Sequence, residues 1–415
     1  MTDLPDEQSV AATLSSTRVQ RLDALDSLLG GGVSSAVFGG QTILFGTGAS
    51  GKALADALAK IGTSRVAVVC NRSVAGSGAV EMLGEQALGA TTVVARLDNV
   101  RAGVPDHEVE KVAAEWQPLG IDTLVAIGGG SAIDTAKALA LLLGGVGSEL
   151  SEFFVRPGEV RDYPGGDFPT VVAVPTTLSG AEVTASAGIS TGSEKRLIRV
   201  EQISPRIVCA DPGNLLPTPQ RLLASTGFCA LAHGIETVYS VKRNPAATAL
   251  ALRSAALLGA GLGELPAGAP LTEQAARLLA SGATLAALAL KGCSSGLQHV
   301  ICQVLGGAAG VPHGVGHSIM LPSVLRFNRP DTRQEQECFS EAVGVFWTET
   351  EGDLPAQAER LREVTGTPAS LRGAGLSRAQ LAECAQKVFR HPGVAGNPRP
   401  VAGEEEILAI LDAAW

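Results

Sequence analysis

Five residues in the second half of the chain have the side chains of a metal centre or of an acid–base site. Cys229 and His233 are four residues apart, which places them on one face of a helix, and His299 lies in a later helical stretch. His313 follows in a loop, and His317 comes one helical turn further on. A thiolate and several imidazoles suit zinc, and imidazole also exchanges protons near pH 7. The spacing predicts either chemistry, although polar side chains that line a cleft or a core show the same spacing.

Two glycine-rich loops could hold a phosphate group, because each joins a predicted strand to a predicted helix. Gly46–Gly51 has the Gly-x-Gly-x-x-Gly spacing of a dinucleotide fingerprint. A chain with 50 glycines produces that spacing by chance, and the next strand ends at Cys70, Asn71 and Arg72 rather than at an acidic residue. Gly128–Ser131 is the better candidate, since consecutive glycines let backbone N–H groups and a helix N-terminus reach a pyrophosphate. A plain tight turn is the alternative for both loops.

The elements that must position these residues change character near residue 212. Before it, apolar runs typical of strands alternate with helical patterns, which indicates a parallel sheet with helical crossovers. The expected strands are Gln41–Phe45, Arg65–Cys70, Thr92–Ala95, Leu124–Ile127 and Val171–Val174, and the expected helices are Lys52–Lys60, Val109–Glu115 and Ala132–Leu143. Beyond residue 212 every pattern is helical, over Leu215–Tyr239, Ala246–Leu262, Thr272–Val304, Gly314–Leu325, Gln334–Phe346, Leu354–Val364 and Arg378–Phe389.

The domain organisation follows from this change. We predict an α/β dinucleotide-binding, Rossmann-like domain over residues 36–212 and an all-α helical substrate and metal domain over residues 213–415, with the active site in the interdomain cleft. Residues 1–35 form an N-terminal extension, which is an appended tail or a short helix, because Val19–Leu29 has helical spacing and is followed by three glycines. The simplest expectation is a mobile extension that carries no chemistry.

Charge and composition limit the partners of the chain. A net charge of −9 disfavours nucleic acid or an anionic membrane as the main partner. No apolar stretch reaches about 18 residues without polar breaks, and the polar, acidic start has no signal-peptide pattern. The seven cysteines are scattered without a Cys-x-x-Cys pair, which indicates reduced thiols. We therefore expect a cytoplasmic protein that binds a small molecule, with no nucleic acid and no membrane.

Four stretches resemble the iron-containing alcohol dehydrogenase superfamily, which includes dehydroquinate synthase-like folds. They are Gly128–Lys137, Pro175–Glu182, Ala224–Glu236 and Pro312–His317. Within the superfamily the chain is most similar to the maleylacetate reductase branch, by the short spacing between the paired threonines and Glu182 and by the segments Leu297–Gly307 and Gly396–Val401. The resemblance runs from about residue 36 to the C-terminus. It implies reduction of a ketone or enone by hydride transfer from NADH or NADPH, and a homodimer formed through the first domain.

The resemblance also implies a cofactor site in the first half. The glycines and the serine would hold the pyrophosphate, Asp134 matches an alcohol dehydrogenase position, and the two threonines would lie beside the cofactor. The residues implied to contact the cofactor are Gly129, Gly130, Ser131, Asp134, Thr176 and Thr177.

Asn71 and Arg72 bear on the choice between the two nicotinamide cofactors. Asn71 matches the position where many dehydrogenases of this fold hold the ribose 2′-OH with an aspartate. Without that carboxylate a 2′-phosphate is not repelled, and Arg72 is placed to pair with it. This favours NADPH or the use of both cofactors.

The metal-ligand positions of the superfamily correspond to Cys229, His233, His299 and His313. The first of these is an aspartate in the metal enzymes and an asparagine in maleylacetate reductases, which are thought to need no metal. A thiolate suits zinc and is a poor ligand for iron in a site of oxygen and nitrogen donors. We therefore disfavour iron, and zinc or a metal-free site remain.

Four positions depart from the maleylacetate reductase branch. Gln298 and Gln303 replace histidines, Val300 replaces a lysine, and Leu178 replaces a tyrosine. Glutamine cannot act as a general acid at neutral pH, and the missing lysine removes a cation for a substrate carboxylate. The cleft is expected to suit a dianionic acid less well than is usual in the branch. Three basic residues could meet a substrate acid or lie on a charged, exposed hairpin: Lys195, Arg196 and Arg199.

Two functions from different classes remain open. In the first, hydride transfer reduces a carbonyl compound, with His299 and His313 as the acid or electrophile pair, His317 as relay and His233 as a further donor. In the second, the fold has been reused as a non-redox lyase, dehydratase or cyclase of a secondary-metabolite pathway. A catalytically weak member that binds a cofactor or a partner is a third, lesser possibility.

Overall fold

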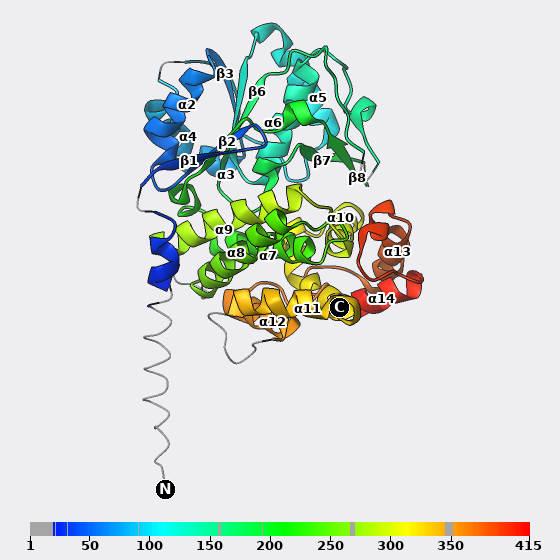
Figure 1. Cartoon of the computed structure of the whole chain (residues 1–415). Coiled ribbons are helices and arrows are strands. Elements are labelled where there is room, and N and C mark those ends of the chain that lie inside the picture. Colours follow the sequence, from blue (N-terminus) through cyan, green and yellow to red (C-terminus); the bar gives the residue numbers. More distant parts are fainter. Residues whose placement is uncertain are drawn as a thin grey trace.

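The chain forms a sheet-containing half and a helical half that pack against each other (Figure 1). The structure is a computed structural model, and it describes residues 20, 22–30, 32–89, 91–156, 159–192, 194–265, 270–344 and 352–415. The two halves meet where strands β2 and β9 and helix α9 contribute to one small apolar cluster, which includes Ile43, Val208 and Ala287.

Seven strands form the main sheet in the order β1-β2-β9-β6-β5-β3-β4. All neighbouring pairs are parallel except the antiparallel pair β1–β2. The strands are β1 Ser34–Phe38, β2 Gln41–Phe45, β3 Arg65–Cys70, β4 Thr92–Leu97, β5 Thr123–Gly128, β6 Thr170–Pro175 and β9 Ile207–Ala210. A separate antiparallel hairpin consists of β7 Ser186–Thr191 and β8 Glu194–Arg199.

The central strands are continuous apolar runs because helices cover both faces of the sheet. In β5, Leu124 and Ala126 pack in one core with α5 and α6, while Val125 and Ile127 pack in the other with α2 and α4. The helices of this half are α2 Leu54–Lys60, α3 Arg72–Ala75, α4 Ala79–Gln86, α5 Asp106–Trp116 and α6 Gly130–Leu143.

The strand order reverses direction between β3 and β5. Chain order runs outward from β3 to β4, and β5 then returns to the other side of β3. The carboxyl ends of these two strands, at Cys70 and Gly128, therefore lie at the switch point where parallel α/β sheets bind their ligands.

The helical half is built around α7, which contacts α8, α9 and α11. Alanines and glycines let these helices approach closely: a Cβ on Gly261 would lie 2.7 Å from Leu279, and one on Gly282 would lie 2.9 Å from Leu258. The helices are α7 Gln220–Val238, α8 Pro245–Gly263, α9 Glu273–Lys291, α10 Leu297–Ala309, α11 His313–Gly344, α12 Leu354–Thr365, α13 Arg378–Phe389 and α14 Glu404–Asp412.

Helix α8 has the length and apolar composition of a membrane span, and it is the one such helix among the described residues. Its position accounts for that composition, because it packs between α7 and α9, and residues such as Ala255 and Leu258 lie in the main core of the helical half.

In the described part of the N-terminal extension residues 22–27 are helical, as the spacing of Val19–Leu29 allowed, and they pack on the helical half, unlike a mobile tail. Leu22 is buried against Leu257 and Leu278, and Asp26 forms an ion pair with Arg277 at 2.6 Å. Residues 22–30 thus dock on α8 and α9, and β1 begins directly after them. Residues 1–19 of the extension lie outside the described part of the chain.

Most of the helices and strands that the sequence predicts are present. The differences occur where the pattern of apolar residues is short, or where it continues across the end of a helix. The expected helix Thr272–Val304 is two helices, α9 and α10. The stretches Gly314–Leu325 and Gln334–Phe346 belong to one helix, α11, with a kink at Thr332, and residues 345–346 are not among the described residues. The elements β1, β9, α3, α4 and α14 were not expected, whereas β7 and β8 form the hairpin that was one interpretation of Lys195, Arg196 and Arg199.

Asp211, at the end of β9, binds the first glycine loop. Its carboxylate accepts hydrogen bonds from the backbone N–H of Gly48 at 3.2 Å, of Ser50 at 2.9 Å and of Gly213 at 2.9 Å. The loop is therefore a structural turn whose amides already have an acidic partner.

Replacing Asp211 by alanine should destabilise the fold, because three N–H groups lose a charged acceptor. We expect a loss of about 3 kcal/mol in the free energy of unfolding. Asp56→Ala is the matched control, since it removes an exposed carboxylate paired only with Lys52, and it should cost less than about 0.5 kcal/mol. Urea unfolding of both variants measures the difference, and equal losses would contradict this role of Asp211.

Candidate active site

The loop after β5 allows a close approach of other groups to its backbone. Gly128 has a φ of +151°, and a Cβ there would lie 2.9 Å from the Cβ of Ala132. A Cβ on Gly129 would lie 3.0 Å from the side chain of Thr177. Gly128 therefore requires glycine, and a side chain at position 129 would require Thr177 to move.

Helix α6 begins at this loop with Gly130 and Ser131, and no described side chain caps its first turn. The first N–H groups of a helix have no intrahelical acceptor and attract an anion. The corresponding amides of Gly46–Gly51 are bound by Asp211. Of the two glycine loops, only the second has amides open to a phosphate within the described structure.

Asn71 and Thr176 flank this loop on the neighbouring strands. The Asn71 Oδ1 atom lies 3.9 Å from the position of a Cβ on Gly128, and it caps α3 by accepting from Val74 N–H at 3.3 Å. Arg72, the next residue, is exposed. The N–H of Thr176 donates to the Gly128 carbonyl at 3.0 Å. The residues singled out at the ends of β3, β5 and β6 therefore lie close together.

Asp134 faces the hairpin rather than the mouth of the glycine loop. Its Oδ2 accepts from Gly188 N–H at 3.0 Å, and its Oδ1 lies 3.5 Å from Lys137 Nζ. Lys137 is fully buried and donates to the carbonyls of Ala181 and Ser186 at 2.6 and 2.7 Å. Together they attach the segment after β6 and the hairpin to α6.

Glu182 is a second buried acid in this segment. It is 1% exposed, and its Oε2 has no hydrogen-bond partner among the described residues. Burial raises the pKa of Glu182 to about 7, against the opposing charge of Lys137. Burial also lowers the pKa of Lys137, which Asp134 and Glu182 oppose.

The four histidines form one cluster where α7, α10 and α11 meet. His233 and His299 stack with their ring centroids 4.8 Å apart. His317 contacts both His299 and His313 edge to face, with centroids 4.6 Å apart in each pair. The Cys229 Sγ atom lies 3.7 Å from His233 Nε2. The five residues singled out by spacing are therefore brought together.

Glu236 is the charged partner of this cluster. It lies on α7 one turn after His233, is 1% exposed, and pairs through Oε2 with His299 Nδ1. Its Oε1 accepts from Gln298 N–H at 2.9 Å, in the first turn of α10. Burial opposes the charge on His299, but Glu236 and Cys229 outweigh it and raise the pKa of His299 to about 10. In the protein without metal His299 is a cation held by a buried carboxylate.

The other three histidines are neutral. Burial lowers the pKa of His233 and that of His317 well below the usual value, and the charge on His299 adds to both effects. Burial, followed by the charge of Lys195 and that of His299, lowers the pKa of His313 to about 3.

Gln298 orients His317. Its Nε2 donates to the His317 carbonyl at 3.3 Å, which fixes the amide nitrogen on this side, and the same nitrogen lies 3.2 Å from His317 Nδ1. His317 Nδ1 is then an acceptor, and its proton lies on Nε2, 3.2 Å from His313 Nε2. A hydrogen-bonded line runs from Gln298 through His317 to His313.

Three donors of the cluster are arranged as a metal site would require. One ligand atom each from Cys229, His299 and His317 lie within 4.8 Å of one another. The His299 Nε2 atom is buried without a hydrogen-bond partner in the described structure, and its Nδ1 is held by a carboxylate, as in many metal-bound histidines. This set shares two residues with the expected four, with His317 in place of His233 and His313.

One loop joins the two candidate sites. A Cβ on Gly130 would lie 3.3 Å from Ser179 Oγ, and a Cβ on Gly180, where φ is +74°, would lie 2.9 Å from His233 Cε1. The loop after β6 therefore contacts the start of α6 on one side and the histidine cluster on the other.

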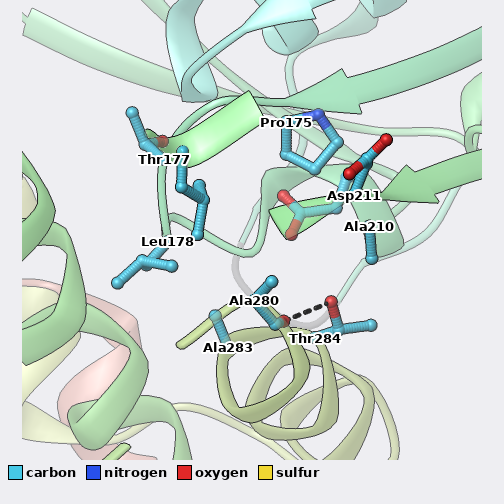
Figure 2. Close-up of a pocket in the computed structure, with 10 residues that line it drawn as sticks. Pro175, Thr177, Leu178, Ala210, Asp211, Ala280, Ala283 and Thr284 are labelled. Atoms are coloured by element: carbon cyan, nitrogen blue, oxygen red, sulfur yellow. Dashed lines mark hydrogen bonds between the residues drawn. The ribbon is translucent and has the colours of Figure 1, made fainter. Parts of the chain in front are cut away.

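A narrow pocket between the halves lies beside this loop (Figure 2). The ends of β6 and β9 contribute one wall and α9 contributes the other, where the Thr284 hydroxyl donates to the Ala280 carbonyl at 2.9 Å. The pocket is lined by Pro175, Thr177, Leu178, Glu182, Ala210, Asp211, Leu215, Ala280, Ala283 and Thr284.

Glu236 was not singled out from the sequence, and Val300 has a packing role in the structure. Glu236 ends the motif that contains His233 and follows that histidine by three residues on α7. This spacing indicates that the two side chains lie on the same face of the helix. Val300 is buried in an apolar core, where a Cβ on Gly393 would lie 2.9 Å from its Cγ2. Position 300 therefore packs in a core rather than carrying a cleft side chain.

The comparisons with known proteins agree with this fold. Residues 40–212 match the iron-containing alcohol dehydrogenase family, and residues 223–415 match the C-terminal part of that family. The chain belongs to the iron-containing alcohol dehydrogenase family. It is therefore an oxidoreductase.

Its relatives include reductases of several carbonyl compounds. The chain is 30% identical over 374 residues to the maleylacetate reductase of Sphingobium indicum, covering 90% of this chain and 94% of that protein. It is 29% identical over 401 residues to the lactaldehyde reductase of Escherichia coli K12, covering 90% and 98%. The same fold occurs in the sulfoacetaldehyde reductase of Bifidobacterium kashiwanohense, solved in complex with NAD⁺, with a TM-score of 0.79, 22% identity and coverage of 92% and 99%.

Glu236→Gln should change how the stability of the metal-free protein depends on pH. In the wild type His299 keeps a proton up to about pH 10, whereas an unfolded histidine loses it near pH 6.5. The stabilisation is complete below pH 6.5 and is lost as the pH rises through about 10. The variant should lack this decline, and the His299 ring signal in ¹³C-labelled protein should titrate below pH 6.5.

The control for that experiment is Glu383→Gln, which removes an exposed carboxylate paired with Lys387 on α13. It should keep the wild-type profile. An unchanged profile for Glu236→Gln would show that the buried carboxylate does not hold the proton on His299.

Proposed function

We propose that the chain is a maleylacetate reductase-like enzyme that reduces a ketone or enone by hydride transfer from NADH or NADPH in the cleft between its two halves. The observation that carries this proposal is the loop after β6. It contacts the start of α6 through Ser179 and the histidine cluster through Gly180, so a cofactor on α6 would extend toward the histidines. The sulfoacetaldehyde reductase of the same fold binds NAD⁺.

The residues that we assign to the cofactor site would have different roles along this edge of the sheet. Gly129, Gly130 and Ser131 would bind the pyrophosphate, Thr177 has a buried hydroxyl without a described partner, and Thr176 fixes the strand end beside it. Asp134 would act indirectly, by holding the hairpin at Gly188. The nicotinamide cofactor supplies the hydride, which is accepted by the carbonyl carbon or the conjugated carbon of the substrate.

The histidine cluster would supply the electrophile and the proton. The His299 Nε2 is unpartnered and its ring is cationic, so it can donate a hydrogen bond to the substrate oxygen as negative charge develops there. Proton transfer to that oxygen leaves His299 neutral beside Glu236. His313 and His317, which share a hydrogen bond, offer the route by which the proton returns, and His233 stacks on His299 and holds its plane.

The same residues fit a metal by the chemistry of their donors. Cys229, His299 and His317 would hold it, and it would polarise the substrate oxygen as a Lewis acid. A thiolate with two imidazoles favours zinc over iron. A metal on Nε2 of His317 would require the Gln298 amide to turn, since its present orientation keeps the proton on that nitrogen.

We also propose a cytoplasmic homodimer whose ligand is a small molecule, with no nucleic acid or membrane partner. All seven cysteines are free thiols, which is consistent with a reducing compartment. The strand β1 lies at the edge of the sheet with Val37 exposed, and an unpaired edge of the first domain is a surface at which a second copy can add.

The proposed function is tested by the absorbance of the reduced cofactor at 340 nm. The purified protein is mixed with NADH or NADPH and with maleylacetate or a panel of ketones and enones. We expect cofactor oxidation that depends on the carbonyl compound and is lost in His299→Ala. Tight cofactor binding without turnover of any of these compounds would contradict the proposal.

Asn71→Asp should shift the cofactor preference toward NADH. A carboxylate at this strand end repels a 2′-phosphate, so the KM for NADPH should rise at least about tenfold while that for NADH changes little. Asn71→Ala is the control, because it removes the α3 cap without adding charge. Equal effects of the two variants on NADPH would contradict the placement of the ribose.

A zinc titration of the metal-depleted protein tests the donor set. Isothermal titration calorimetry should show about one Zn²⁺ per chain, with affinity weakened at least about tenfold in Cys229→Ala. Cys338→Ala, which changes an exposed thiol, should bind as the wild type does. Unchanged binding in Cys229→Ala, or tighter binding of Fe²⁺ than of Zn²⁺, would contradict the zinc assignment.

A further inference from the structure

Lys195 is an unpaired cation beside the histidine cluster. It lies at the start of β8 and is half-buried, and its ammonium has no ion pair or hydrogen bond within the part of the chain that the structure describes. Its neighbour Arg196, in contrast, pairs with Glu194 at 3.3 Å and lies over the ring of Phe154 at 5.5 Å. Successive residues of a strand point to opposite sides, so the two cations have different surroundings.

Two glycines place Lys195 close to its neighbours. A Cβ on Gly307 would lie 3.1 Å from the backbone nitrogen of Lys195, which lets β8 rest directly on α10. A Cβ on Gly188 would lie 2.5 Å from Lys195 Cε, and the Oδ2 of Asp134 is 3.8 Å from the same point. The lysine side chain therefore lies against β7 close to Asp134, while β7 contacts α6 and β8 contacts α10.

The positive charge of Lys195 also affects the histidine cluster. Besides the cationic His299, it is the one cation among the described residues found to lower the pKa of a cluster member, and that member is His313. Its ammonium is thus within electrostatic reach of His313, which we place on the route by which the proton returns to His299.

The acids closest to this part of the structure already have other partners. Asp134 and the buried Glu182 face Lys137, and Glu236 pairs with His299. Of the other cations that the sequence offered, Arg196 pairs with Glu194 and lies over Phe154, and Arg199 lies close enough to Lys291 to lower its pKa. A half-buried ammonium without a partner gains most from an anion, and a carboxylate is the anion that a carbonyl substrate most simply carries.

We propose that Lys195 binds a single carboxylate of the substrate, so that the compound reduced is an oxo acid with one acid group rather than a dianion. The proposal rests on the proposed function, since it names the substrate class of the same site. Lys195 is then a specificity residue that holds the acid end while the histidines meet the carbonyl end.

The test compares oxo acids with their neutral esters. The probes are 2-oxopentanoate, 4-oxopentanoate and 5-oxohexanoate, their methyl esters, and the dianion 4-oxoheptanedioate, with the NADPH-bound enzyme for kinetics and the NADP⁺-bound enzyme for calorimetric Kd values. For at least one acid, Lys195→Gln should raise KM and Kd at least about tenfold, with a smaller change in kcat and no change for the ester.

Matched variants separate recognition from folding. Lys195→Arg keeps the charge and should retain most of the affinity for the acid, and Arg196→Gln, one residue along the same strand, should behave as the wild type. Thermal unfolding of all variants reports whether the hairpin is intact. If Lys195→Gln unfolds, the comparison of Lys195→Arg with Lys195→Met in the Kd measurement takes its place.

The outcomes are distinct. Equal binding of acids and esters by the wild type, equal loss for both in Lys195→Gln, or at least tenfold tighter binding of the dianion would overturn the proposal. If no carbonyl compound is turned over, the proposed function fails, and the Kd values still decide: acid-selective binding lost in Lys195→Gln supports the carboxylate site, and its absence overturns it.

Discussion

The buried carboxylate of Glu236 is the interaction on which the rest of the site depends. A carboxylate at 1% exposure is costly unless it is paired and hydrogen-bonded. Glu236 meets both conditions at once, through His299 Nδ1 and through the N–H of Gln298 in the first turn of α10. The positive end of the α10 dipole adds to this stabilisation. One side chain on α7 therefore fixes where α10 begins and keeps His299 charged.

The neighbours of that carboxylate follow from its position. Gly296 has no side chain because a Cβ there would lie 3.1 Å from Glu236 Oε1 and 3.3 Å from Asn397 Oδ1. Asn397 accepts from the N–H of Leu297, the residue before Gln298, and is bonded to Asn328 on α11, so the C-terminal segment holds the same helix start. The histidines on three helices are then fixed relative to one another. The loop after β6 relates them to the glycine loop.

The sequence predicted what depends on local patterns and missed what depends on tertiary contacts. The buried strands could be predicted because a short, continuous apolar run is typical of a strand that is covered on both faces. The Gly128–Ser131 loop could be predicted because it joins such a strand to a helix. The structural role of the first glycine loop depends on Asp211, which accepts a hydrogen bond from Gly48 N–H, 163 residues away in the chain. No spacing in the sequence reveals this contact. The position of Val300 in an apolar core could not be predicted, because contacts with other helices determine which side of α10 faces that core. The orientation of Gln298, and hence the proton on His317, required the positions of both side chains.

The account depends most on whether hydride passes from the cofactor to the substrate in this cleft. NADPH deuterated at the 4R position, and separately at the 4S position, is incubated with a turned-over carbonyl compound, and the product is examined by mass spectrometry and NMR. The account predicts deuterium on one carbon of the product with one of the two labels and none with the other. A product that forms without deuterium from either label would contradict it and would indicate a non-redox reaction on this fold.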